Sequence, residues 1–112
     1  MLINDIHSMI KELSSGSVLN AVPILCSADP NRNLESVMGK IEGMLQSSVF
    51  NFDQAVIQIE ASTAGTEFAD QVKRYLDTCQ TTVTGLLAWS LSTKRYGLVR
   101  HKQSDGSIKY TL

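Results

Sequence analysis

Apolar side chains recur at every third or fourth position along most of this chain, a spacing typical of one face of an α-helix. No pair of segments shows the alternation of apolar and polar residues that predicts neighbouring strands. The pattern therefore predicts an all-α fold of four or five helices. We expect helices over residues 2–13, 17–28, 33–60 and 66–91, within a helical domain over residues 1–96 that is followed by a loose polar tail over residues 97–112.

The ends of the predicted helices carry residues that favour capping or termination. Gly16 ends the first helix, because glycine readily adopts the left-handed conformation found there. Ser17, Asn33 and Thr66 are suited to cap the next three helices, since their side-chain oxygens accept backbone hydrogen bonds. Pro23 should kink the second helix or delay its start by one turn. The apolar residues from Phe68 to Leu87 should form the inner side of the last helix.

The bulk composition narrows the range of functions. A net charge of −1 gives no general attraction to nucleic acid or to an anionic membrane. No apolar run approaches the roughly 18 residues of a membrane span, and residues 1–10 lack the pattern of a signal peptide. Cys26 and Cys79 fit no zinc spacing, so we expect two reduced, buried thiols in a cytoplasmic protein.

Three oxygen-bearing residues, Asn4, Ser8 and Glu12, recur every four positions along the first predicted helix. Oxygen atoms are the ligands that Mg²⁺ prefers. The axial rise from residue 4 to residue 12 is about 12 Å, which is long for one ion. Side chains lean towards the helix N-terminus, however, so Glu12 can reach back towards Ser8. A solvated polar face with Asn4 or Asp5 as the helix cap is the alternative interpretation of the same spacing.

A second group of polar residues follows the last predicted helix. Arg95 carries a planar fork of donors suited to phosphate oxygens, and the Tyr96 hydroxyl adds another donor. Residues 94–112 hold five cationic residues and one acidic residue, a balance that favours an anionic ligand. Taken alone, the Arg-Tyr pair also fits an ordinary surface, and the preceding Trp89 also fits a helix core.

The string NDIHSMIKE at residues 4–12 resembles the NSE metal motif of class I terpene cyclases, especially fungal and bacterial ones. The resemblance implies the C-terminal helices of the class I terpenoid synthase fold. By matching position, it implies that Asn4, Ser8 and Glu12 bind one Mg²⁺ ion. It also implies that Lys11 contacts the diphosphate of an isoprenyl diphosphate substrate.

The string WSLSTKRY at residues 89–96 resembles the Arg-Tyr ending of the same family. This likeness implies that Arg95 and Tyr96 bind the substrate diphosphate when the site closes. It implies further that Trp89 lines the apolar cavity, where its π face stabilises a carbocation. The order of the two strings and the helical span between them agree with the family.

The resemblance extends over essentially the whole chain but over only about the final third of a complete cyclase. The family's other metal motif is rich in Asp, whereas no two acidic residues are adjacent in this chain. Because ionisation of an allylic diphosphate needs several cations at once, we expect this polypeptide alone to be inactive. The expected partner, besides substrate, is either the missing N-terminal part of the same fold or a second copy of the chain.

Two other interpretations stay open at the level of sequence. The chain fits a non-catalytic interaction module that pairs through an apolar stripe and keeps the motif as a relic. It also fits an unrelated helical bundle that matches the motifs by chance. Helices that normally wrap a cavity expose an apolar side without their partners, so we expect the isolated chain to self-associate or to be molten.

Overall fold

The computed structural model of the chain describes residues 2–31 and 33–109. These residues form four α-helices and one short 3₁₀ helix: α1 (Leu2–Ser14), α2 (Ala21–Ala28), α3 (Leu34–Thr63), α4 (Ala69–Ser92) and η1 (Leu98–His101). Strand-like pairing in the described ranges is limited to one isolated bridge between Lys102 and Ile108. The prediction of an all-α fold is confirmed.

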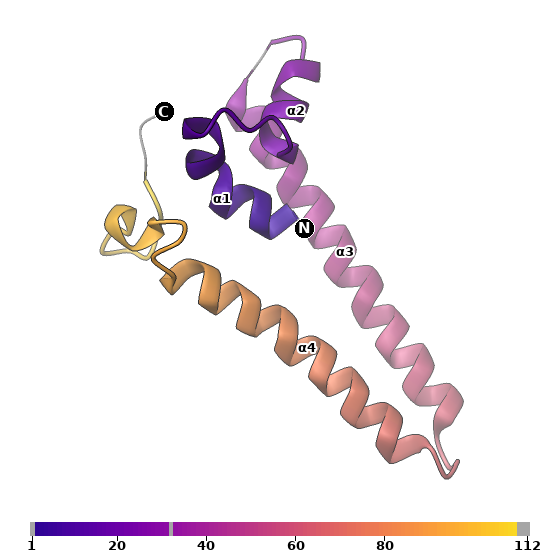
Figure 1. Ribbon diagram of the computed structural model, residues 1–112. Coiled ribbons are helices and arrows are strands. Elements are labelled where there is room, and N and C mark those ends of the chain that lie inside the picture. The colour runs from indigo at the N-terminus through magenta and orange to yellow at the C-terminus, as the bar shows by residue number, and fades with distance from the viewer. Residues whose placement is uncertain (1, 32, 110–112) are drawn as a thin grey trace.

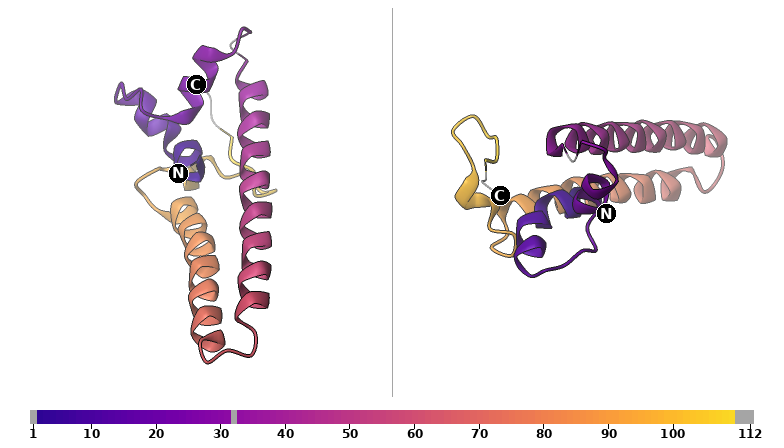
Figure 2. Two further views of the ribbon diagram at one scale, coloured as in Figure 1. Left: turned by 90° about the vertical axis from the view of Figure 1, so that its right-hand side faces the viewer. Right: turned by 90° about the horizontal axis from the view of Figure 1, so that it is seen from above.

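The two long helices form an antiparallel hairpin, and the two short helices pack at its open end. Figure 1 shows α3 and α4 meeting at the turn over residues 64–68 and diverging towards their other ends. There α1 lies between the start of α3 and the end of α4, and Figure 2 shows the same arrangement from two further sides. The first helix of the chain is therefore placed beside the end of the last long one.

A small apolar core holds α1 in this position. Met9 of α1, Val22 of α2 and the pair Val37 and Ile41 of α3 are all buried and form one cluster. Hydrophobic side chains at helical spacing on three elements thus meet at the open end of the hairpin. Because α1 buries one side in this cluster, its other side is turned towards the C-terminal end of α4.

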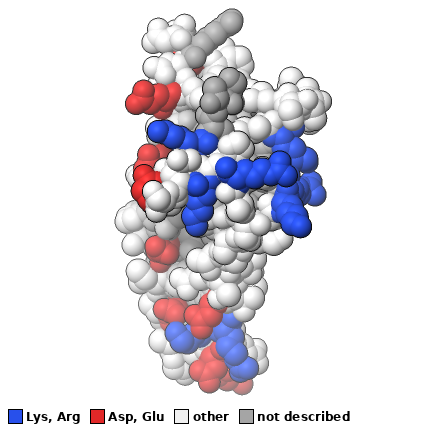
Figure 3. Space-filling view, turned by 90° about the vertical axis from the view of Figure 1, so that its left-hand side faces the viewer, with Lys and Arg blue, Asp and Glu red and all other residues white. Residues whose placement is uncertain are grey.

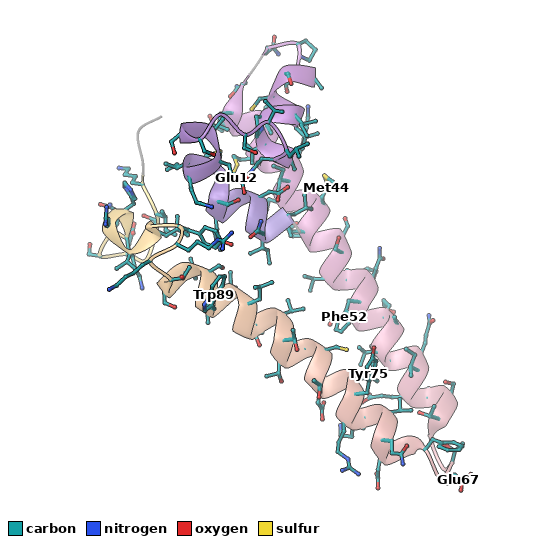
Figure 4. The ribbon with its side chains drawn as sticks, in the orientation of Figure 1. Glu12, Met44, Phe52, Glu67, Tyr75 and Trp89 are labelled. Carbon is teal, nitrogen blue, oxygen red and sulfur yellow. The ribbon has the colours of Figure 1, made fainter. Side chains whose placement is uncertain are left out.

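Most apolar side chains on the long helices remain exposed. The predicted inner side of α4 is largely open to solvent: Leu76 is buried, but 69% of Tyr75 and 51% of Val83 are exposed. Phe52 of α3 and Tyr75 of α4 lie towards the space between these two helices (Figure 4). An open, mainly apolar groove of about 520 Å³ lies between α3 and α4, with Ile3 of α1 also on its wall.

The start of α2 differs from the sequence prediction. The cap is Asn20 and not Ser17, since the Asn20 side-chain oxygen accepts from the backbone N–H of Val22 at 2.9 Å. The helix begins at Ala21, so Pro23 falls in the first turn. A missing N–H costs no helical hydrogen bond there, and this explains the delayed start.

The caps of the two long helices give one confirmation and one correction. Asn33 caps α3 as predicted, with its side-chain oxygen accepting from the N–H of Glu35 at 2.9 Å. Thr66 does not cap α4, because its hydroxyl donates to the carbonyl of Thr63 and the helix starts after Phe68 without a side-chain cap.

Three remaining expectations concern the thiols, the membrane and the tail. Cys26 and Cys79 form no disulfide, but both are half-buried and not fully buried as predicted. None of the helices in the described residues is both long enough and apolar enough to cross a bilayer.

After Tyr96, Gly97 adopts a left-handed conformation (φ 69°) that turns the chain into η1, where Leu98 is buried. Residues 110–112 of the predicted tail lie outside the described residues.

Candidate functional site

The two polar groups singled out from the sequence lie side by side. The Tyr96 hydroxyl donates to the side-chain oxygen Oδ1 of Asn4 at 2.7 Å, although the two residues are 92 positions apart. A second link joins His7 Nδ1 of α1 to Ser90 Oγ of α4, also at 2.7 Å. These two hydrogen bonds attach α1 to the C-terminal end of α4.

The direction of the hydrogen bond between His7 and Ser90 depends on the tautomer of His7. Ser90 is buried, and its hydroxyl hydrogen is donated to the carbonyl of Leu87 at 2.9 Å. In that arrangement the Ser90 oxygen accepts from His7 Nδ1–H, whereas in the other His7 tautomer Nδ1 accepts from the Ser90 hydroxyl. Neither residue was assigned a role from sequence. Both lie inside the two motif strings, residues 4–12 and 89–96. Their contact could not be predicted from local residue spacing, because the two residues are 83 positions apart.

This partly buried contact predicts a pH dependence of stability. Burial lowers the pKa of His7 below its usual value of 6.5. The unfolded chain therefore takes up a proton before the folded one as the pH falls through 6.5, and the stability supported by neutral His7 declines below that value. We expect urea unfolding to give a lower free energy at about pH 5.5 than at about pH 7.5. The variant His7→Gln should reduce this difference, and an unchanged pH dependence in that variant would contradict the assignment.

The predicted metal ligands occupy one side of α1. Ser8 is buried, and Asn4 and Glu12 are half-buried. The Ser8 hydroxyl is near enough to Glu12 to help lower the pKa of that carboxyl, but its geometry falls short of a hydrogen bond. The Ser8 oxygen is therefore a buried polar atom without a hydrogen-bond partner in the described part of the chain. Burying such an atom destabilises the fold unless a ligand or a water molecule binds to it.

Glu12 is held in its ionised form. The side-chain amide of Asn20 donates to its Oε2 at 2.8 Å, and this bond is the largest cause of the lowered pKa of Glu12. The nearby Ser8 hydroxyl and the positive charges of Lys11 and Arg95 lower the pKa further. The influence of Arg95 on Glu12 is a second sign that the two motifs share one electrostatic environment.

The residues predicted to bind diphosphate lie at the edge of this group. Lys11 and Arg95 are exposed, and neither forms an ion pair with any carboxylate that the structure describes. The Arg95 guanidinium lies 6.0 Å from the centre of the Tyr96 ring. Figure 3 shows Lys and Arg side chains gathered on the side of the molecule where α1 and the C-terminal segment lie.

Trp89 contacts Tyr96 and does not line the groove between the long helices. The two rings meet edge to face, with centroids 5.8 Å apart and planes at 82°. Trp89 is 48% exposed and lies on α4 near its C-terminal end, in the part of the molecule that also holds Glu12 (Figure 4). Its indole therefore supports the Tyr96 ring and keeps an open face.

Asn20 was not predicted from the sequence to belong to the site, and Asp5 was considered only as a helix cap. Asn20 is buried, and its Nδ2 donates to the carbonyl of Asp5 at 2.7 Å in addition to Glu12. The Asp5 side chain accepts in turn from the backbone N–H of Ala21 at 3.0 Å. The sequence could have indicated Asn20 as a helix cap, because asparagine is a good capping residue. Its contact with Glu12 could not be predicted in this way, because that contact depends on how α2 packs against α1.

The donor set suits a hard cation. Asn4, Ser8 and Glu12 offer an amide, a hydroxyl and a carboxylate oxygen, which are the ligand types of Mg²⁺. Asn4 Oδ1 retains a second lone pair beside the bond from Tyr96. In the described residues, this site included, there is no group of three or more His, Cys, Asp or Glu side chains that suits a metal ion. The unpaired Ser8 oxygen and this chemistry fit an ion on α1.

The sequence is similar to terpene synthases and cyclases over most of its length. It is 30% identical to the sesquiterpene cyclase hepA of Aspergillus oryzae over 99 residues, which cover 87% of this chain and 27% of that protein. It is 33% identical to (+)-germacrene D synthase of Selaginella moellendorffii over 97 residues, covering 85% of this chain and 26% of that enzyme. Pristinol synthase of Streptomyces pristinaespiralis is 26% identical over 100 residues, covering 86% and 27%.

The chain thus spans about a quarter of the length of these three relatives. No family model matches the sequence, and no solved structure matches the fold. The similarity to synthases from a fungus, a plant and a bacterium supports a relationship to terpene cyclases, and it agrees with the all-helical structure.

Proposed function

We propose that this chain forms part of a class I terpene cyclase that acts on an isoprenyl diphosphate and releases diphosphate. In this proposal Asn4, Ser8 and Glu12 hold one Mg²⁺ ion. The observation that carries it is the 2.7 Å hydrogen bond from Tyr96 to Asn4, because it joins the two motifs that the family resemblance treats as one site. The similarity to terpene synthases supports the reaction class.

The diphosphate is proposed to lie between α1 and the end of α4. Lys11 and Arg95 are exposed there and offer cationic donors, of which Arg95 suits two phosphate oxygens at once. The Tyr96 hydroxyl donates to Asn4, and rotation of its O–H bond would redirect the hydrogen to a phosphate oxygen bound beside it. The Mg²⁺ ion, when bound, supplies positive charge that stabilises the leaving diphosphate.

The rest of the cyclase is proposed to cover the exposed apolar surfaces of the hairpin. Val49, Phe52 and Val83 line the groove between α3 and α4 and are exposed to solvent. Exposed apolar patches of this kind mark surfaces that other elements cover. We propose that further helices of the same fold, from the part of the relatives that this chain does not span, pack there and complete the cavity. The exposed surface also fits the alternative of a non-catalytic helical module.

Calorimetry with inorganic diphosphate tests the proposed site. We expect diphosphate to bind to the 112-residue chain when Mg²⁺ is present and to bind far more weakly without it, because an ion held by Asn4, Ser8 and Glu12 would add positive charge beside the ligand. Sulfate serves as the control for general attraction to the cationic C-terminal segment. Equal binding of diphosphate with and without Mg²⁺, or equal binding of sulfate, contradicts the proposal. No binding at all by a chain whose amide exchange shows a folded α1 favours the non-catalytic module.

A further inference from the structure

One buried side chain connects the cap of α2 to the carboxylate of Glu12. Asn20 is 2% exposed, and its side chain makes three hydrogen bonds. Its oxygen accepts from the N–H of Val22 at 2.9 Å, and its nitrogen donates to the Asp5 carbonyl at 2.7 Å and to Glu12 Oε2 at 2.8 Å. A carbonyl and a carboxylate only accept, and an N–H only donates, so these partners determine the orientation of the amide.

The capping role alone does not require asparagine at this position. Asp and Ser cap helices about as well as Asn, because each has an oxygen that accepts from the first turn. Asn20 makes two further bonds as a donor, and among the good capping side chains only the amide combines an acceptor with two donated hydrogens. Asparagine at position 20 is therefore suited both to the hydrogen bond with Glu12 and to the cap of α2.

The surroundings of Asn20 show why Glu12 needs such a partner. Glu12 lies near the C-terminal end of α1 on a long side chain with several rotatable bonds, and it is only half-buried. The bond from the Ala21 N–H to Asp5 fixes the segment that carries Asn20 against α1. The amide is thus held at a set distance from the helix and directs one oxygen of the Glu12 carboxylate.

We infer that Asn20 is a positioning residue, which holds Glu12 in the orientation that binds the metal ion. The inference rests on the proposed function for its metal, and it adds a residue outside the NDIHSMIKE string to the site. Outer partners of metal ligands typically raise metal affinity by about 10-fold to 100-fold, because they order the ligand before the ion arrives. Asn20 also leaves the second carboxylate oxygen, Oε1, without a bond from this amide.

The test compares the same substitution at two helix caps. Asn20→Asp keeps the oxygen that caps α2 but removes both donated hydrogen bonds. Asn33→Asp is the matched control, because Asn33 caps α3 in the same way and has no bond to Glu12. Asn20→Ser is a second variant that caps α2 without adding a negative charge beside Glu12, in case the aspartate destabilises the fold.

Two measurements are made on the 112-residue chain. Without metal, NMR three-bond couplings report whether the Glu12 side chain keeps one rotamer, and amide exchange reports whether α1 stays folded. With Mn²⁺ as the probe, paramagnetic broadening reports the metal affinity. We expect both Asn20 variants to average the Glu12 rotamers and to weaken Mn²⁺ binding about tenfold, while Asn33→Asp changes neither.

The outcomes separate this inference from the proposed function. A single Glu12 rotamer in both Asn20 variants, or averaged Glu12 couplings in the unmutated chain, overturns it. Loss of α1 protection in both variants also overturns it, because Asn20 then acts on the fold and not on Glu12. If the unmutated chain binds no Mn²⁺ but the Asn20 variants average the Glu12 rotamers, the result supports the positioning of Glu12 by Asn20 and contradicts the proposed metal site.

Discussion

Replacing Glu12 by Gln is expected to lower Mg²⁺-dependent turnover of an allylic diphosphate at least about 100-fold, which corresponds to about 2.7 kcal/mol in the barrier. The measurement requires a protein that joins this chain to the remaining length of a related cyclase. The substituted amide side chain would keep an oxygen that accepts from Asn20, so the local fold is retained. The substitution removes the negative charge, and the proposed site has only this one carboxylate among its three ligands.

The control for this prediction is Glu67→Gln. Glu67 is an exposed glutamate in the turn between α3 and α4, at the end of the hairpin farthest from the site (Figure 4). It undergoes the same chemical change without touching the proposed ligands. Equal turnover of Glu12→Gln and the unmutated protein, or equal losses in the two variants, would reject Glu12 as a metal ligand.

Replacing Arg95 by Ala is expected to weaken Mg²⁺-dependent diphosphate binding roughly 10-fold to 100-fold, the usual effect of losing hydrogen bonds from a charged group. Arg95 is exposed, so its removal leaves no buried cavity. Its guanidinium lies over the Tyr96 ring, and the loss of that contact also loosens Tyr96. Calorimetry with inorganic diphosphate measures the change.

Two variants refine the result for Arg95. Arg100→Ala removes an exposed cation from the same C-terminal segment, and it should leave diphosphate affinity nearly unchanged. Arg95→Lys keeps the charge but not the fork of donors, and it should restore part of the affinity. Similar losses for Arg95→Ala and Arg100→Ala would show that the segment attracts anions through its charge alone.

Local sequence patterns located the helices well and their ends less well. Gly16 and Asn33 mark real helix boundaries, because left-handed glycine and side-chain capping act within a few residues of the chain. Ser17 and Thr66 have the same capping chemistry, but the chain uses Asn20 and an uncapped start at Phe68. Several residues near each boundary can cap, and the packing of α2 against α1 selects among them.

The burial of the long helices could not be predicted from their periodicity. The apolar face of α4 was expected to point inward, and Val83 does line the groove beside α3, but Tyr75 and Val83 are largely exposed. Periodicity shows that a helix has an apolar side, but it does not show what lies opposite that side. In this structure α3 covers only part of it, and the groove beside Phe52 and Val83 stays open.

The sequence by itself determined the all-α class and the positions of the residues that carry the proposed chemistry. Asn4, Ser8 and Glu12 share one side of α1 because a helix repeats about every 3.6 residues, and this follows from their spacing alone. Only the tertiary structure decided that Tyr96 reaches Asn4, that His7 reaches Ser90 and that Asn20 holds Glu12. The physical reason is that these contacts join segments between 8 and 92 residues apart, whose approach depends on the packing of α1 among α2, α3 and α4.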